Sequence, residues 1–223
     1  MQRRLLIATV GLAALLGARS GSAQAPAQAP APTLSPIMLP PPQTDGGKPL
    51  MQALALRATS RSFATDPLPQ QTLSNLLWAA WGINRKAEGK RTAPSARNWQ
   101  EITVVVLTAA GAHAYDAAAN TLVPLVAGDL RPLGGVQEFV KDAPVTLVFV
   151  ADMTRVAGDP AEQKAMAWAD TAFISENVYL FCASFGLATG VRAMVDRPTL
   201  AKALKLRETQ LVTFAQSVGF PKK

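Results

Sequence analysis

An almost wholly apolar run, VTLVFV from Val145 to Val150, limits the possible folds of this chain more than any other stretch. A strand with apolar side chains on both faces must be covered on both faces, because either face would otherwise meet water. A second run rich in β-branched residues, Ile102 to Leu107, predicts another strand. The sequence therefore favours a layered domain in which helices flank a central sheet.

Helical and strand periodicities are mixed along the rest of the chain, and several antiparallel connections are expected. Leucines at helical spacing begin near Leu50 and again at Leu73, while Gly82 and Gly186 follow the last residues of two helical patterns. The expected fold class is α+β. The expected helices are Leu50 to Leu56, Leu73 to Trp81, Ala161 to Phe185 and Pro198 to Leu206, and the further strands are His113 to Tyr115, Thr121 to Leu125, a short one near Val191 and Gln210 to Val218.

The first 23 residues have the pattern of a cleavable signal peptide. Arg3 and Arg4 precede an apolar run that starts at Leu5, and small residues up to Ala23 offer a cleavage point. A membrane anchor is the competing interpretation, but the uncharged stretch is shorter than the ~20 residues needed to cross a bilayer. We expect an exported protein, periplasmic or secreted, with no membrane span after cleavage. The two arginines partly match a twin-arginine signal.

Residues 24–47 follow as an expected disordered spacer. Ala, Pro and Gln make up most of the stretch from Gln24 to Pro42, and such a composition buries too little apolar area to offset the chain entropy lost on folding. The sequence thus divides into a signal peptide (1–23), a spacer (24–47) and one folded domain (48–223).

Charge and cysteine content exclude several classes of function. Loss of Arg3, Arg4 and Arg19 would lower Lys+Arg from 22 to 19 against 15 acidic residues, and no basic stripe remains, so no nucleic-acid partner is expected. Cys182 is the only cysteine, which rules out an internal disulfide and favours a buried packing role. His113 lacks neighbours at metal-ligand spacing and is expected at the surface, so no metal site is predicted.

Two polar segments are candidate binding sites. RATSRSF, from Arg57 to Phe63, carries two arginines and three hydroxyl groups, which are the donors that a phosphate monoester needs. The alternative is a solvated helix end. PSARN, from Pro94 to Asn98, is a turn of small residues that a ligand can approach closely, and Asn98 offers a donor and an acceptor. Its alternative is an ordinary loop leading into a strand.

The first segment resembles the phosphate-binding pattern R-x-[ST]-x-[RK]-x-F of the nitroreductase family of FMN-dependent flavoproteins. Arg57, Thr59 and Arg61 are followed by Phe63 at the family's spacing. The resemblance implies a nitroreductase-like fold, with a central and mostly antiparallel sheet, and an FMN phosphate bound by Arg57, Ala58, Thr59 and Arg61.

The second segment is similar to the family's P-S-x-x-N-x-Q pattern, which packs on the flavin of the neighbouring subunit. Pro94, Ser95, Asn98 and Gln100 match it, with Ala96 between them. The resemblance therefore implies an intertwined homodimer, in which Pro94, Ser95, Ala96 and Asn98 contact the cofactor of the other chain.

Further matches follow in the family's order toward the C-terminus. Gln137, before the apolar strand, would face the flavin ring or its ribityl chain, and the long helix with Asn177 is similar to the family's dimer-forming helix. The family's K-x-R segment after the last strand is not matched, so either Lys222 or Lys223 is the expected substitute, with Lys222 taken as the candidate. The outline is close to the SagB-type, thiazoline-oxidase-like branch, although its Lys-Tyr pair is not visible.

Such a protein would pass a hydride or an electron pair through flavin N5 to or from a small organic molecule. The flavin itself would carry out the redox chemistry, so no catalytic residue is assigned to the protein. Export separates the chain from cytoplasmic nicotinamides, which suggests a periplasmic electron donor. The alternative function is flavin or ligand binding without significant turnover.

Overall fold

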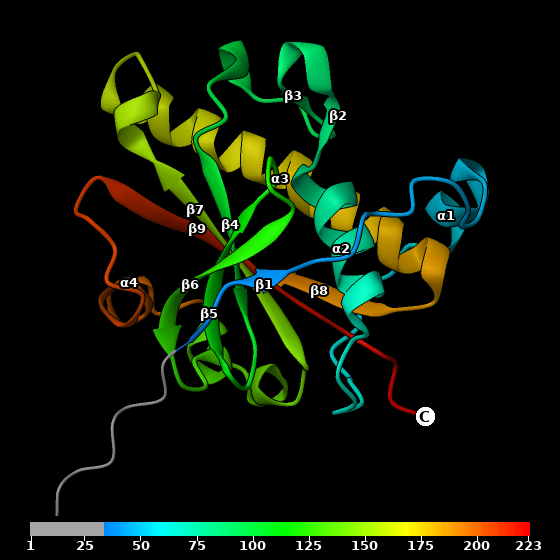
Figure 1. Cartoon of the computed structure of the whole chain (residues 1–223). Helices are drawn as coiled ribbons and strands as arrows, with labels where there is room; N and C mark the ends of the chain where they lie inside the picture. The colour runs from blue at the N-terminus through cyan, green and yellow to red at the C-terminus, as the bar shows by residue number, and fades with distance from the viewer. Residues whose placement is uncertain (1–33) are drawn as a thin grey trace, which may run out of the picture. The chain divides into compact units, whose positions relative to one another are not determined.

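The computed structural model describes residues 34–223, so the expected signal peptide and residues 24–33 of the expected spacer lie outside the described part of the chain. Its centre is a seven-stranded sheet with the order β1-β6-β5-β4-β7-β9-β8 (Figure 1). Every strand pair in this sheet is antiparallel. The strands are β1 (Ile37–Met38), β4 (Ile102–Leu107), β5 (Gly111–Asp116), β6 (Thr121–Ala127), β7 (Val145–Asp152), β8 (Ala188–Arg192) and β9 (Gln210–Gly219).

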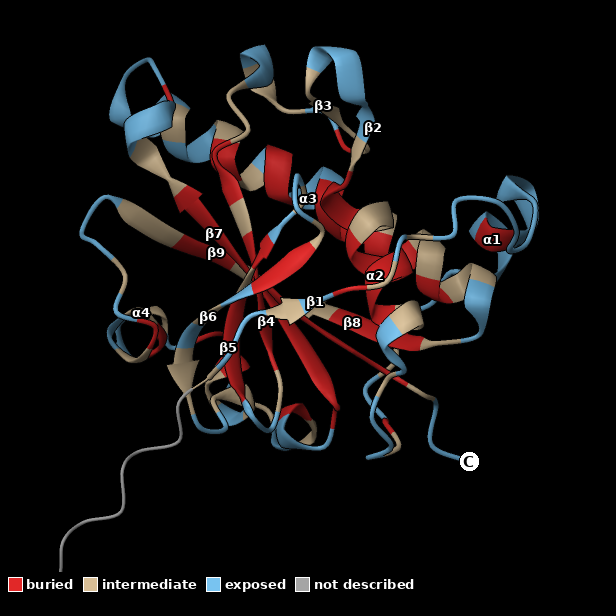
Figure 2. Ribbon diagram, viewed as in Figure 1, coloured by how far each residue is buried: buried red, intermediate tan, exposed pale blue. Residues whose placement is uncertain are grey.

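Strand β7 lies inside the sheet between β4 and β9, as its apolar sequence predicts. Alternate side chains enter two different layers: Leu147 and Phe149 pack in one cluster, and Val148 and Val150 pack in another. All four are at most 1% exposed, and Figure 2 shows the strand buried along most of its length. The expectation of a strand covered on both faces is confirmed.

The helices α1 (Leu50–Leu56) and α2 (Gln70–Trp81) each pack against α3 (Pro160–Phe185). Residues of α2 and α3 join the Leu147 cluster on one face of the sheet, whereas α4 (Arg197–Ala203) contributes Leu200 to the cluster on the opposite face. Helix α3 begins where the Asp159 carboxylate accepts hydrogen bonds from two backbone amides, and it ends at Gly186, whose φ of 71° is left-handed. The α+β class is confirmed.

Two details of the structure differ from the expectations. Helix α4 ends before the expected Leu206, because Lys205 adopts a left-handed φ of 55° and the amide of Leu206 turns back to the carbonyl of Ala201. A small hairpin of β2 (Ile83–Arg85) and β3 (Lys90–Arg91) was not expected, because its strands are short and polar and show no alternation. Short 3₁₀ turns also occur at 86–88, 96–98, 131–134, 138–141 and 153–155.

Part of the expected disordered spacer is ordered. Ile37 and Met38 pair with Leu122 and Thr121 of β6, and Leu39 is only 6% exposed. The next residues cross α2, where the Ser74 hydroxyl donates to the Pro40 carbonyl at 2.5 Å. The order of this N-terminal strap (residues 37–46) does not follow from its composition, because it comes from backbone hydrogen bonds to a sheet edge and one buried leucine rather than from apolar content.

The single histidine and cysteine are both buried. His113 is 1% exposed in β5, so the expectation of a surface histidine is wrong; burial lowers its pKa. No group of metal-ligating side chains occurs among residues 34–223. Cys182 is fully buried in α3, as expected, and burial raises the pKa of its thiol.

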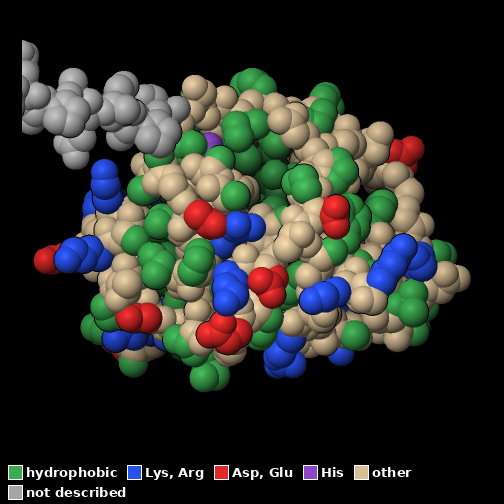
Figure 3. Space-filling view, turned by 90° about the horizontal axis from the view of Figure 1, so that it is seen from below, with side chains coloured by type: hydrophobic (Ala, Val, Ile, Leu, Met, Phe, Trp, Pro, Cys, Tyr) green, Lys and Arg blue, Asp and Glu red, His purple; other side chains and the backbone are tan. Residues whose placement is uncertain are grey.

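Positive and negative side chains are interspersed on the face shown in Figure 3, and they do not gather into one basic stripe there. No helix within residues 34–223 combines the length and apolarity needed to cross a bilayer.

We expect Leu39→Ala to lower the free energy of unfolding by about 2 kcal/mol or more, because it leaves a cavity between the strap and the sheet. The adjacent Met38→Ala is the matched control: Met38 is 69% exposed, so its loss should change stability by less than about 0.5 kcal/mol. Urea denaturation of both variants measures the difference. Equal, small effects would mean that the strap does not pack on the domain.

Candidate functional site

The predicted phosphate-binding segment, residues 57–63, runs alongside β8. The amide of Ser60 donates to the carbonyl of Thr189 at 2.8 Å. At Gly190 a Cβ atom would lie 2.7 Å from the carbonyl oxygen of Ser60, so only glycine allows the segment to approach this closely. The side chains of Arg57, Thr59 and Arg61 remain exposed beside the strand.

Tyr179 of α3 fixes this segment to the sheet. Its hydroxyl accepts a hydrogen bond from the amide of Val191 at 3.0 Å and shares another with the Thr59 hydroxyl at 3.0 Å. The Arg57 guanidinium lies 5.5 Å from the centre of the tyrosine ring, a cation–π distance. Sequence reasoning did not identify Tyr179, because nothing in the helical pattern distinguishes it from a core residue.

The end of the chain lies beside the same segment. Phe63 and Pro221 form an antiparallel bridge, and the amide of Ala64 donates to the carbonyl of Phe220 at 2.9 Å, which brings Lys222 to this region. Arg57, Arg61 and Lys222 form no ion pair within residues 34–223. These three cationic side chains thus lie on neighbouring segments of the chain and have no ion-pair partner among the described residues. Such a group can bind a phosphate dianion.

Gln137 lies next to the end of β8. Its side-chain amide nitrogen is 3.5 Å from the Met194 sulfur, and the amide of Val136 donates to the Met194 carbonyl. The Gln137 Oε1 atom is buried and has no hydrogen-bond partner among the described residues. Phe63 stacks on Phe139 with ring centres 6.1 Å apart, so Gln137 and the phosphate-binding segment belong to one region.

The turn from Pro94 to Asn98 has a strained backbone. Arg97, Asn98 and Gln100 have φ values of 48°, 57° and 49°, in the left-handed region that non-glycine residues avoid. Each such residue costs on the order of 1 kcal/mol, and such conformations persist where surrounding contacts impose them, often at functional sites.

Hydrogen bonds from both sides hold the turn in this form. The Ala96 amide donates to the Asp170 carboxylate at 2.8 Å, and the Gln100 amide donates to the Ser95 hydroxyl at 3.1 Å. The Gln100 side chain accepts from Arg91 Nε at 2.8 Å and donates to the carbonyl of Gly89 at 3.0 Å. The turn is therefore preorganised.

The structure brings residues 57–63, Gln137 and Lys222 together but keeps the turn apart from them. Asp170, which holds the turn, and Tyr179, which holds the phosphate-binding segment, are nine residues apart on α3. This separation corresponds to about 14 Å along the helix axis. Within one chain the predicted site residues form two separate groups.

Two buried carboxyl groups lie behind the turn. Glu101 is 1% exposed and Asp170 is 2% exposed. Burial, reinforced by the neighbouring Asp170 carboxylate, raises the pKa of Glu101 to about 7. Burial also raises the pKa of Asp170, but the Ala96 amide opposes this by stabilising the ionised form. We therefore place the shared proton on Glu101 and the negative charge on Asp170.

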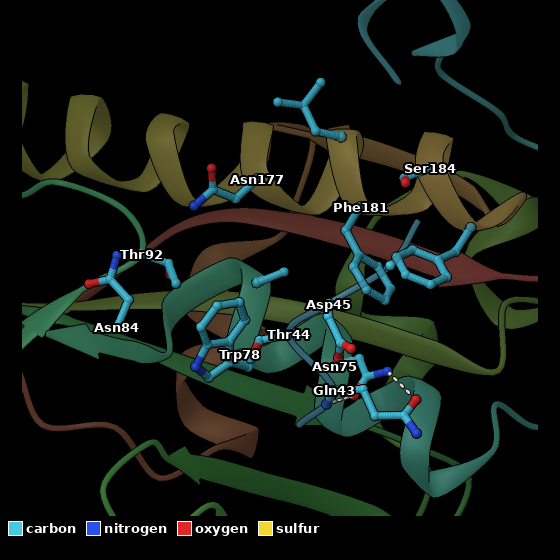
Figure 4. A pocket seen from close by; sticks show the side chains of 14 residues that line it. Gln43, Thr44, Asp45, Asn75, Trp78, Asn84, Thr92, Asn177, Phe181 and Ser184 are labelled. Carbon is cyan, nitrogen blue, oxygen red and sulfur yellow. Dashed lines mark hydrogen bonds between the residues drawn. The ribbon is translucent and has the colours of Figure 1, made fainter. Parts of the chain in front are cut away.

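A separate cavity of about 340 Å³ lies between α2, α3 and the strap. Figure 4 shows Trp78 of α2 and Asn177 and Phe181 of α3 around it, with Gln43 of the strap hydrogen-bonded to Asn75. None of the predicted site residues lines this cavity. Its lining combines aromatic rings and side-chain amides and has one titratable group, Asp45.

The chain belongs to the nitroreductase family, whose model matches residues 54–220. It is 28% identical over 177 residues to a candidate nitroreductase of Methanocaldococcus jannaschii, covering 73% of this chain and 87% of that protein. A solved structure of a candidate nitroreductase from Ralstonia eutropha is 39% identical, covers 87% of this chain and 95% of its own, and superposes with a TM-score of 0.82.

A more distant structure, the NADPH:FMN oxidoreductase of Vibrio harveyi complexed with NAD⁺, is 19% identical. It covers 78% of this chain and 69% of its own with a TM-score of 0.59, which is a likeness of fold. The nitroreductase-like fold expected from the sequence is confirmed. Membership of the family implies flavin-dependent oxidoreductase activity.

Replacing Glu101 by glutamine should change how stability depends on pH. The folded chain keeps a proton on Glu101 up to about pH 7, whereas the carboxyl group has an ordinary pKa of 4.5 when it is not buried. Wild-type stability should therefore decrease as pH rises between these values, while the neutral glutamine removes this contribution.

Urea denaturation across this pH range measures the effect. The difference in unfolding free energy between Glu101→Gln and wild type should shift in favour of the variant as pH rises, then level off. The exposed Gln52→Ala, which changes no titratable group, serves as control and should show a constant difference. A constant difference for Glu101→Gln as well would show that Glu101 ionises normally in the folded chain.

Proposed function

We propose that this chain is an FMN-dependent oxidoreductase that acts on small organic molecules. The observation that carries the proposal is the group of cations Arg57, Arg61 and Lys222 beside β8, without acidic partners among the described residues. The close backbone approach at Gly190 and the unpartnered Gln137 oxygen also fit a polar, phosphate-bearing ligand. We propose a flavin as this ligand because the chain belongs to the nitroreductase family.

In the proposed site, the protein binds and orients the cofactor. Arg57, Thr59, Arg61 and Lys222 hold the phosphate, Ala58 lies within the same segment, and Gln137 contacts the ring or the ribityl chain. Bound FMN supplies the redox chemistry, because its N5 position can accept a hydride or an electron pair and pass it on. Tyr179 keeps the Thr59 hydroxyl in place through its 3.0 Å hydrogen bond.

We also propose that the protein functions as a homodimer in which the turn with Pro94, Ser95, Ala96 and Asn98 contacts the FMN of the other copy. The separation of the turn from residues 57–63 within one chain supports this arrangement. Large exposed apolar side chains on α1 and α3, which pack together, offer a surface for the second copy. They are Leu50, Met51, Leu54, Phe173 and Phe185, each between 45% and 75% exposed.

The connection between β7 and α3 is short, since α3 begins at Pro160 after one 3₁₀ turn. No helical insertion interrupts this connection, and we propose that the site is open on the substrate side. From the general outline of the motifs we also propose that the chain lies near the SagB-type, thiazoline-oxidase-like branch. An open site also favours the second candidate, a flavin-binding protein without turnover. A protein that binds FMN but passes electrons to no quinone, nitroarene or oxygen would favour this second candidate.

Export is part of the proposal, because Arg3, Arg4 and the following apolar run have the pattern of a signal peptide. A periplasmic or secreted enzyme does not meet the cytoplasmic nicotinamide pool. We therefore propose that a periplasmic partner, or the organic substrate itself, reduces the protein.

Arg57→Ala and Asn98→Gly should each weaken FMN binding. Loss of a charge-assisted contact at Arg57 costs about 1.5 to 3 kcal/mol, or roughly ten-fold or more in affinity. Glycine at residue 98 removes the side chain but keeps the left-handed backbone available. Fluorescence titration with FMN measures both, and the distant, exposed Lys202→Ala is the control.

Mixed dimers of the two variants then test the shared site. Because the turn is proposed to act across the interface, one site of the mixed dimer combines an intact Arg57 with an intact Asn98, and half of the sites should bind FMN with wild-type affinity. If the turn served its own chain, every site would contain one defect and no high-affinity fraction would appear. A monomer with bound FMN would also contradict the proposal.

Reduction by nicotinamides should be slow. In a stopped-flow experiment with the FMN-loaded protein, micromolar NADH or NADPH should bleach the flavin absorbance much more slowly than a strong chemical reductant such as dithionite. Rapid bleaching would overturn the proposal of a periplasmic donor and favour a nicotinamide-dependent cycle.

A further inference from the structure

Arg192, the last residue of β8, has an unusual environment. Its side chain is buried, with the residue only 7% exposed. The guanidinium donates to the carbonyl of Gly134 at 2.6 Å, to the Ser217 hydroxyl at 2.9 Å and to the carbonyl of Gly190 at 3.4 Å. It also lies 5.7 Å from the centre of the Phe139 ring. All of these partners are electrically neutral.

A buried charge without a counter-charge is costly, and proteins retain one mainly where function requires it. Arg192 forms no ion pair within residues 34–223. Burial lowers the pKa of its side chain to about 10, so it is still protonated at neutral pH. A guanidinium has five N–H donors and Arg192 makes three hydrogen bonds, so donor capacity remains.

The surrounding backbone is shaped to admit this side chain. A Cβ atom at Gly135 would lie 2.4 Å from Arg192 Nε, so any larger residue there would displace the guanidinium. The same Cβ position is 3.0 Å from Gln137 Oε1, the buried oxygen that has no hydrogen-bond partner among the described residues. An unsatisfied acceptor and an uncompensated cation thus lie in one corner of the site.

The position along β8 indicates which part of a ligand this corner would meet. Gly190 contacts the phosphate-binding segment through Ser60, and Arg192 is two residues further along the strand, on the same face. Two residues of a strand span about 6.6 Å. The phosphate already has the exposed cations Arg57, Arg61 and Lys222. Arg192 and Gln137 are therefore placed for the next part of the cofactor.

We propose that Arg192 supplies the positive charge that stabilises the ring of reduced FMN, an inference that rests on the proposed function. Uptake of two electrons and one proton leaves the flavin ring with one negative charge, at its N1–C2=O edge. A fixed cation near this edge binds the reduced form more tightly than the oxidised form and so raises the midpoint potential. Neither binding motif found in the sequence contains this residue.

Arg192→Met tests the inference, because methionine fills similar space without charge. Oxidised FMN should bind the variant within about three-fold of wild-type affinity, whereas the affinity for reduced FMN should fall at least ten-fold more than the affinity for oxidised FMN. This ratio corresponds to a midpoint potential lower by about 30 mV or more for a two-electron couple. Arg192→Lys should retain most of the wild-type potential. Dye-coupled redox titration measures the potential.

Arg197→Met is the matched control, since Arg197 also donates only to electrically neutral groups, in its case three backbone carbonyls, but belongs to α4 on the other face of the sheet. Its potential should equal that of wild type. If Arg192→Met does not fold, judged by its thermal melting, Arg192→Gln keeps a donor for the Gly134 carbonyl and should show the same lowered potential.

Titration with riboflavin, which lacks the phosphate, separates the possible outcomes. If Arg192→Met weakened oxidised and reduced FMN equally and left riboflavin binding unchanged, the charge would serve the phosphate, and the inference would be wrong. An unchanged midpoint potential would overturn it as well. Failure of the wild-type protein to bind FMN would instead refute the proposed function.

Discussion

The packing of α3 across the sheet is the contact on which both groups of site residues depend. One helix carries Asp170, which holds the strained turn through the Ala96 amide, and Tyr179, which holds the proposed phosphate-binding segment (residues 57–63) against β8. Both side chains are buried, so their positions follow from the core between α3, β4 and β7 rather than from flexible loops. The close-packed core therefore positions the two side chains that hold both groups of candidate site residues.

Burial of charged groups divides the site into two environments. Near β8 the uncompensated charge is positive, at Arg192, whereas behind the turn it is negative, at Asp170, with a proton held on the adjacent Glu101. Each charge is stabilised by backbone: the Gly134 carbonyl faces Arg192, and the Ala96 amide faces Asp170. At these two buried charges, backbone dipoles thus give the stabilisation that an oppositely charged side chain gives at most buried charges.

The long periodic elements could be predicted from the sequence, but the details that shape the site could not. The β7 strand and helix α3 were found because their patterns extend over many residues and end at clear signals, such as Gly186. The left-handed residues at 97, 98 and 100 have no sequence signature, since none is glycine. The burial of Arg192 could not be predicted from the short strand expected near Val191. It depends on the glycines at 134 and 135, which are far away in the sequence.

The N-terminal strap has a consequence for assembly and solubility. Strand β6 would otherwise be the edge of the sheet, with unpaired backbone groups able to recruit a strand from another molecule. Strand β1 pairs with the first two residues of this edge, Thr121 and Leu122, and is followed by Pro40, Pro41 and Pro42. Proline lacks an amide hydrogen, so the covering segment makes a poor template for a further strand. At this end of β6 the strap therefore hinders the addition of a strand from another molecule.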